Sequence, residues 1–174
     1  MRIGLAFTKP ISWIAASYIA KQRKHFRQAS KQLPASQCSH LQAFFPPAIL
    51  EKVRVANAAV PSPPFYRSLR KLGLKTIPDL STIAGITFMD VIVHSERLSD
   101  DLLFHELVHV VQYEVLGLKR FAERYVRGFL STGSYADIPL ERQAYALEAR
   151  FTKRPKEAFS VLESVTEWNQ SRSF

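Results

Sequence analysis

The clearest helical pattern in the sequence covers residues 100–116, where apolar side chains fall on nearly every side of the expected helix. A helix that is apolar all round is a buried one. Ser99 is expected to cap its first turn, where Asp100 and Asp101 also favour the helix dipole. Gly117 is expected to end it. The pattern therefore predicts a central buried helix whose polar exceptions share one narrow sector: His105, Glu106, His109 and Gln112.

The remaining periodicity predicts a mostly helical α+β domain with a small sheet. Apolar residues at helical spacing predict further helices, which we place at 11–32, from 46 onward, 65–74, 118–130, 139–151 and 155–168. β-branched and aromatic residues dominate 84–94 and predict a single strand, with a second short extended piece at 53–55. Residues 34–40 are predicted to form a loop.

Composition fits one compact domain, because 174 residues with 47% hydrophobic content can bury a core. A single cysteine excludes an internal disulfide and any multi-cysteine zinc finger. No apolar run reaches 18 residues, which predicts no transmembrane segment, and we expect no cleaved signal peptide. A cytoplasmic location is the resulting expectation.

Charge divides the chain into a basic region, 1–80, and a core, 81–174. The first has 13 Lys/Arg against 2 Asp/Glu, and the second has 11 against 13, so the net charge of +9 comes entirely from the first. We expect the basic region to be mainly helical and to pack on the core. Its charge suits an anionic partner, nucleic acid or the surface of a membrane, but a solvated basic surface explains it equally well.

The polar sector of the central helix contains the pattern H-E-x-x-H. His105 and His109 stand four residues apart, so both imidazoles lie on one face and can converge on a zinc ion at about 2.0–2.1 Å each. Glu106 flanks that position and can take a proton from a water that the metal activates. The alternative is a pair of core histidines bonded to backbone carbonyls, with Glu106 as their counter-charge.

A catalytic zinc normally has three protein ligands and a water, so one ligand is missing from the motif. No histidine follows His109, which leaves a carboxylate of the helix predicted at 139–151. Glu141 lies in its first turn and Glu148 two turns later, roughly 10 Å along the axis, so both cannot bind one ion. Glu141 is favoured and Glu148 stays an alternative.

These residues resemble the glutamate-zincin class of zinc metallopeptidases, in particular small bacterial metallopeptidase-like domains. The similarity covers about 84–151 and rests on the strand 85–93, the helix with His105-Glu106-Leu107-Val108-His109-Val110-Val111-Gln112, and Glu141-Arg142-Gln143-Ala144-Tyr145. The resemblance implies a zincin-like fold, Zn²⁺ on His105, His109 and Glu141, and hydrolysis of a peptide or protein with Glu106 as general base. Thermolysin-like enzymes carry an Asp where this chain has Tyr145, so Glu148, Asp137 or a backbone carbonyl must orient the zinc-binding histidine.

The same resemblance needs a donor that stabilises the oxyanion, for which Tyr145, Tyr135 and Arg142 are candidates. Tyr145 as ordinary core packing is an equal alternative. The free edge of the strand before the metal helix can pair with an extended substrate.

The competing function is a non-catalytic, metal-stabilised binding module whose basic region contacts nucleic acid or anionic membrane. A protease of DNA-bound proteins ranks last, because such enzymes take a third histidine.

Overall fold

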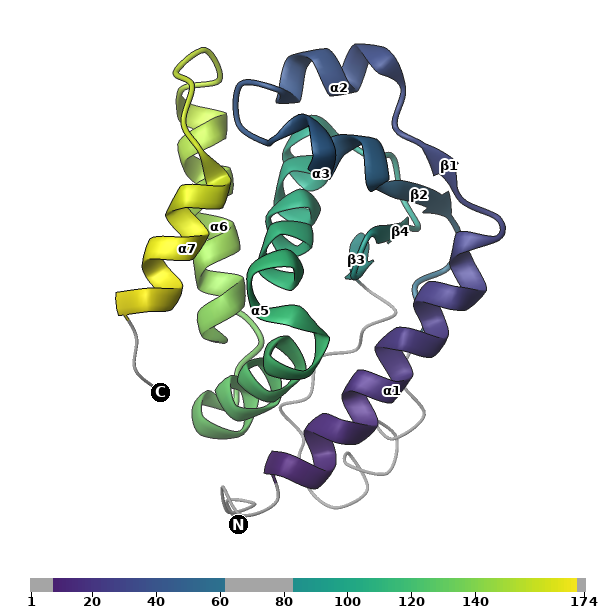
Figure 1. Cartoon of the computed structure of the whole chain (residues 1–174), viewed down its shortest axis with the longest axis vertical. Helices are drawn as coiled ribbons and strands as arrows, with labels where there is room; N and C mark the ends of the chain where they lie inside the picture. The colour runs from purple at the N-terminus through teal and green to yellow at the C-terminus, as the bar shows by residue number, and fades with distance from the viewer. Residues whose placement is uncertain (1–7, 62–82, 172–174) are drawn as a thin grey trace.

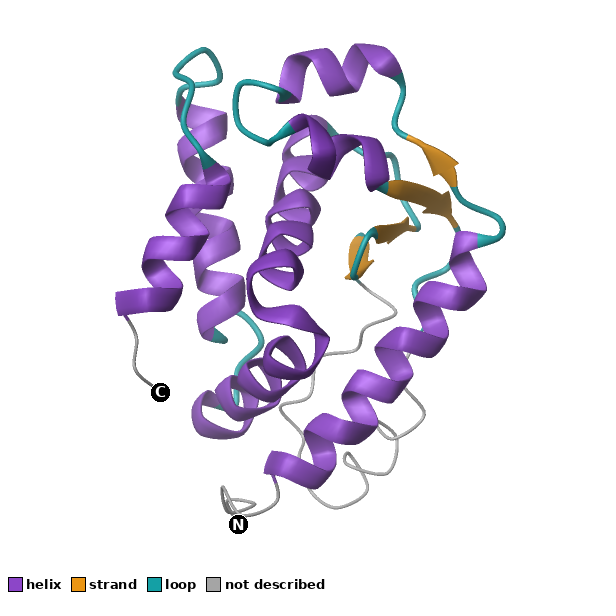
Figure 2. Ribbon diagram, viewed as in Figure 1, coloured by secondary structure: helices purple, strands orange, loops and turns teal. Residues whose placement is uncertain are grey.

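The computed structural model describes residues 8–61 and 83–171 (Figure 1). The helix predicted at 65–74 lies outside these residues. The helices are α1 (Thr8–Arg27), α2 (Ala35–Leu41), α3 (Pro47–Lys52), α5 (Asp100–Thr132), α6 (Pro139–Lys153) and α7 (Val161–Ser171). The strands are β1 (Lys31–Gln32), β2 (Arg54–Asn57), β3 (Gly85–Phe88) and β4 (Val91–His94). The predicted mostly helical α+β fold is confirmed, as Figure 2 shows.

The four strands form one mixed sheet in the order β1-β2-β4-β3. β2 runs parallel to β4, whereas the β1–β2 and β3–β4 pairs are antiparallel. Strands of the basic region and of the core region therefore share the sheet. β3 forms one edge of the sheet built by the described residues, and it packs against α5.

The single strand predicted at 84–94 is wrong, because the segment is a hairpin of β3 and β4. The chain reverses at Met89, which has a φ of 62°, a left-handed conformation that a methionine rarely adopts. Asp90 completes this turn and accepts hydrogen bonds from Arg23 and Arg27 of α1. Asp90 is the polar residue of this turn, but no glycine or asparagine marks the reversal in the otherwise mostly apolar segment.

Three other predicted boundaries are wrong. The first helix ends at Arg27, and the residues predicted as its last turn, Lys31–Gln32, form β1. The predicted loop at 34–40 is mostly helix α2, which buries Leu41. The last helix begins at Val161, because the Ser160 hydroxyl accepts the Glu163 N–H and so caps it there.

Helix α5 lies at the centre of the molecule, with α6 and α7 on one side and α1 and the sheet on the other (Figure 1). Every residue from Leu103 to Tyr113 is buried, as predicted. The Ser99 side chain accepts the Leu102 N–H at 3.2 Å, which confirms the predicted cap. Gly117 interrupts the helix with φ 72° and ψ 160°, so its first half ends where the sequence predicted.

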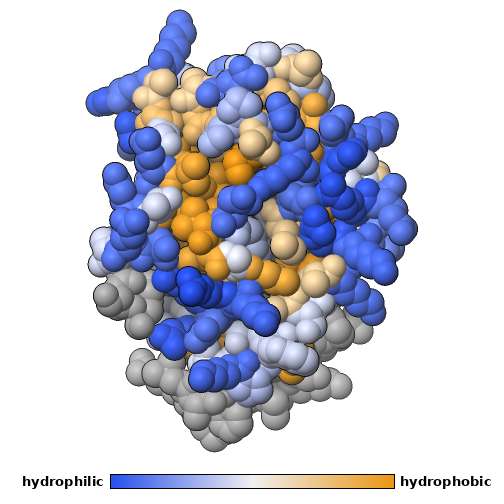
Figure 3. Space-filling model, in the orientation of Figure 1, coloured by the Kyte–Doolittle hydropathy of each residue, from blue (hydrophilic) through white to orange (hydrophobic). Residues whose placement is uncertain are grey.

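The surface in Figure 3 is mostly hydrophilic, with an apolar strip between α7 and α3. Within residues 8–61 and 83–171, no helix combines the length and the apolar character needed to cross a membrane.

Candidate metal centre

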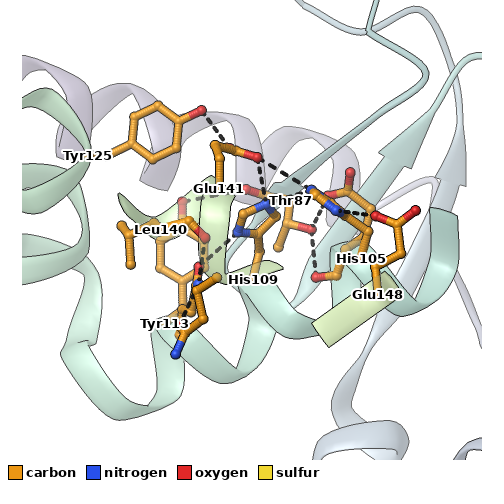
Figure 4. Close-up of polar contacts among 11 residues, drawn as sticks. Thr87, His105, His109, Tyr113, Tyr125, Leu140, Glu141 and Glu148 are labelled. Atoms are coloured by element: carbon orange, nitrogen blue, oxygen red, sulfur yellow. Dashed lines mark hydrogen bonds and ion pairs between the residues drawn. The ribbon is translucent and has the colours of Figure 1, made fainter. Parts of the chain in front are cut away.

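The two motif histidines face each other from consecutive turns of α5, with their Nε2 atoms 3.1 Å apart (Figure 4). Their Nδ1 atoms point away and have partners of their own. His105 Nδ1 lies 2.9 Å from a carboxylate oxygen of Glu148, and His109 Nδ1 lies 2.8 Å from the amide oxygen of Gln112. When the imidazoles are neutral, acceptors at both Nδ1 atoms keep the proton there and leave the Nε2 lone pairs directed at a common point.

The carboxylate of Glu141 reaches the same point from the first turn of α6. Its Oε2 lies 3.4 Å from both Nε2 atoms, beyond the usual hydrogen-bond range of about 2.7–3.2 Å. Glu141 is only 1% exposed, and no described residue donates a hydrogen bond to this oxygen. The other oxygen, Oε1, accepts from the Tyr125 hydroxyl at 2.8 Å. One buried oxygen therefore remains without the partner that buried polar atoms require.

The three donor atoms fit a divalent metal ion. Ligand atoms at about 2.0–2.1 Å from a tetrahedral ion are about 3.3–3.4 Å from one another. The observed separations are 3.1, 3.4 and 3.4 Å. Two imidazoles and one carboxylate are also a ligand set of catalytic zinc. His105, His109 and Glu141, all buried, could thus hold a metal ion.

Glu148, the alternative third ligand, lies on the other side of His105 and contacts Nδ1 rather than Nε2. It cannot share an ion with the Nε2 atom of His105. Its position matches the other role considered for it, which is to orient a metal-binding histidine in place of the aspartate of thermolysin-like enzymes.

The charged groups of this cluster shift one another's pKa values. Burial opposes protonation of His105, but the carboxylates of Glu141 and Glu148 beside its ring outweigh burial and raise its pKa to about 10. Burial also opposes ionisation of Glu141, but the charges of His109 and His105 outweigh it and hold the pKa of Glu141 well below its usual range. Without a metal, the cluster therefore keeps a proton on the histidines and a negative charge on Glu141.

Glu106 lies beside the cluster and borders a pocket of about 460 Å³. Its side chain is buried, and its Oε2 accepts from the Thr87 hydroxyl at 2.6 Å. Burial raises the pKa of Glu106, and the charges of His109 and His105 act against that rise. Residues 83–85, before and at the start of β3, form one wall of the same pocket, which also contains His105.

Two of the three oxyanion-donor candidates border the pocket. Tyr135 and Tyr145 both line it, and the Tyr145 ring lies 4.5 Å from the His105 ring. Tyr145 is 46% exposed, so its interpretation as ordinary core packing is wrong. Arg142 is exposed and is not among the residues that line the pocket.

Three partners of the site were not predicted from the sequence in these roles. Gln112 orients His109, and its amide N–H group also donates to the Leu140 carbonyl and to Gln143, which links α5 to α6. Its local signal is a polar residue three positions after His109 in an apolar helix. Thr87 is one polar residue in an apolar strand, and Tyr125 has no local signal because its contact with Glu141 crosses between helices.

Comparisons with protein-family models, curated proteins and solved structures find no match to this chain. Function is therefore inferred from the residues of the site.

Proposed function

We propose that this chain is a zinc-dependent metallopeptidase. The observation that supports this most is the buried Oε2 of Glu141, which lacks a hydrogen-bond donor and faces two imidazole nitrogens beside an open pocket. His105, His109 and Glu141 would hold the zinc. When bound there, zinc supplies a Lewis acid that acidifies water and polarises a carbonyl.

Glu106 acts as the general base in this proposal. It accepts the proton of the attacking water and passes it to the leaving amine as the peptide bond breaks. A carboxylate serves best in this role when its pKa is closer to neutral than usual, and burial raises the pKa of Glu106 in that direction. The Thr87 hydroxyl fixes one of its two oxygens.

Tyr145 and Tyr135 are the proposed donors to the negative oxygen that forms on the substrate carbonyl. Burial raises the pKa of both phenols, so both keep their proton at neutral pH and can donate it in a hydrogen bond. Tyr145 is the more accessible of the two, and its ring lies against His105.

A peptide or protein is the proposed substrate because the pocket adjoins a sheet edge. Gly85 begins β3, the edge strand, and also lines the pocket. An extended peptide that adds to this edge would be held by main-chain hydrogen bonds and would pass the metal-binding residues.

The alternative, a metal-stabilised binding module, explains less of the structure. Structural zinc sites are closed, whereas His105 and Glu106 both border the pocket. Some of the basic charge also has an internal role, since Arg23 and Arg27 bind Asp90. These ion pairs attach α1 to the β3–β4 turn and need no external anionic partner.

The test is zinc-dependent cleavage of unstructured protein and peptide substrates by wild type, Glu106→Gln and Glu123→Gln. Glu123 lies on the same helix as a matched control. Glu106→Gln is expected to keep its zinc and to lose hydrolysis by about 10²–10⁴-fold, the usual contribution of a general base. Cleavage by Glu106→Gln at the wild-type rate, or none by zinc-loaded wild type, would contradict the proposal.

A further inference from the structure

We infer that the edge strand β3 positions the general base, with Thr87 and Gly85 together holding Glu106 so that its Oε1 is the proton acceptor. This inference rests on the proposed peptidase function. Gly85 and Thr87 are two residues apart in β3, so their α-substituents point to the same face of the strand. That face meets the carboxylate of Glu106.

Thr87 engages one oxygen of the carboxylate. Its buried hydroxyl lies 2.6 Å from Glu106 Oε2 and 3.1 Å from the main-chain carbonyl of the same residue. A hydroxyl has one proton to donate, and the shorter contact to a charged acceptor takes it. Oε2 is therefore the anchored oxygen.

Gly85 leaves space for the other oxygen. A Cβ atom at this position would stand 2.9 Å from Glu106 Oε1 and 3.2 Å from Leu102 Cδ1, closer than a side chain can be accommodated without displacement. Gly85 also lines the pocket. Oε1 thus lies against Gly85 at the pocket wall and is the oxygen left to accept a proton, while Oε2 is fixed by Thr87.

One strand consequently controls two parts of the reaction. The proposed substrate pairs with the edge of β3, and the same strand sets the position of the base relative to that substrate. Thr87 is a positioning residue in this scheme, because it acts through Glu106. A misplacement of about 1 Å in such an arrangement can lower a rate by about 10²-fold.

The experiment compares zinc-loaded Thr87→Val, Thr87→Ser, Gly85→Ala and the control Thr166→Val on α7. Thr87→Val keeps the shape of the side chain and removes its hydroxyl. We expect its kcat to fall about 10- to 100-fold, with KM within about twofold and zinc content unchanged. Thr87→Ser retains the hydroxyl and is expected to stay within about threefold of wild type. Gly85→Ala is expected to lose kcat as well, because its methyl group displaces Oε1.

A kcat of Thr87→Val equal to that of Thr166→Val would overturn the inference, and so would a loss that Thr87→Ser fails to restore. Crystal structures provide a readout that needs no activity. The Glu106 carboxylate should turn away from its wild-type position in Thr87→Val and keep it in Thr87→Ser. An unmoved carboxylate in Thr87→Val would overturn the positioning role, whereas inactive zinc-loaded wild type would contradict the peptidase function itself.

Discussion

Replacing Glu141 or Glu148 by glutamine tests which of the two is the proposed metal ligand and which the residue proposed to orient one. The two carboxylates both contact His105, but from opposite sides of the ring. Glu141 Oε2 faces the Nε2 atoms of both histidines, whereas Glu148 bonds to His105 Nδ1. Each variant removes one carboxylate charge, and the two positions differ in which histidine nitrogens the carboxylate faces.

The expected magnitudes follow from these positions. Zinc bound by four protein ligands gains about 10–16 kcal/mol, or about 2.5–4 kcal/mol for each ligand. Losing the Glu141 carboxylate should therefore weaken zinc binding about 10²- to 10³-fold. The amide oxygen of a glutamine at position 148 can still accept the His105 Nδ1–H, so Glu148→Gln should weaken binding by no more than about tenfold, the lower end for a residue that orients a ligand.

The assay is competition for zinc against a chromophoric chelator, with Glu167→Gln on the exposed face of α7 as a matched control. Circular dichroism of each metal-free variant checks that the fold is retained. The metal would not bind on the Nε2 side of the histidines if Glu148→Gln weakened zinc affinity as much as Glu141→Gln did. A larger effect of Glu148→Gln would lead to the same conclusion.

Three further predictions concern groups around the site and the docking of α1. Tyr125→Phe removes the donor to Glu141 Oε1 and should weaken zinc binding about 10- to 100-fold in the same chelator assay, and unchanged affinity would contradict its role. Without metal, the pKa of His105 is raised to about 10, so this histidine is protonated at pH 7. Zinc binding should therefore release at least one proton, and zinc affinity should increase as the pH rises from 7 to 9. Calorimetry in two buffers of different ionisation enthalpy measures that release, and no buffer dependence would refute it. Asp90→Asn should lower the free energy of unfolding by about 1 kcal/mol, because its partners Arg23 and Arg27 are partly exposed, and an unchanged denaturation midpoint would contradict this.

The central helix could be predicted from sequence because its determinants are local. Ser99 caps it, Gly117 interrupts it, and the apolar positions between them define a buried cylinder. The four-residue spacing of His105 and His109 then brings the two imidazoles together without information from the rest of the chain. The start of α6 at Pro139 is local for the same reason, since proline suits the first turn of a helix.

The contacts that complete the site depend on tertiary packing instead. Spacing alone did not decide between Glu141 and Glu148, because the choice depends on how α6 lies against α5. Thr87 reaches Glu106 because β3 packs against α5, in a hairpin that turns at Met89, a residue with no turn signal. Tyr125 meets Glu141 because α5 changes direction at Gly117, a residue whose local signal predicts only a helix end.

Anomalous diffraction at the zinc edge, on crystals of the full chain grown with zinc, tests the metal centre most directly. We expect one strong peak bonded to Nε2 of His105, Nε2 of His109 and a carboxylate oxygen of Glu141, with Glu148 outside the coordination sphere. A peak elsewhere, or two imidazoles that face Glu141 with no ion between them in crystals grown with zinc, would contradict the proposed metal centre.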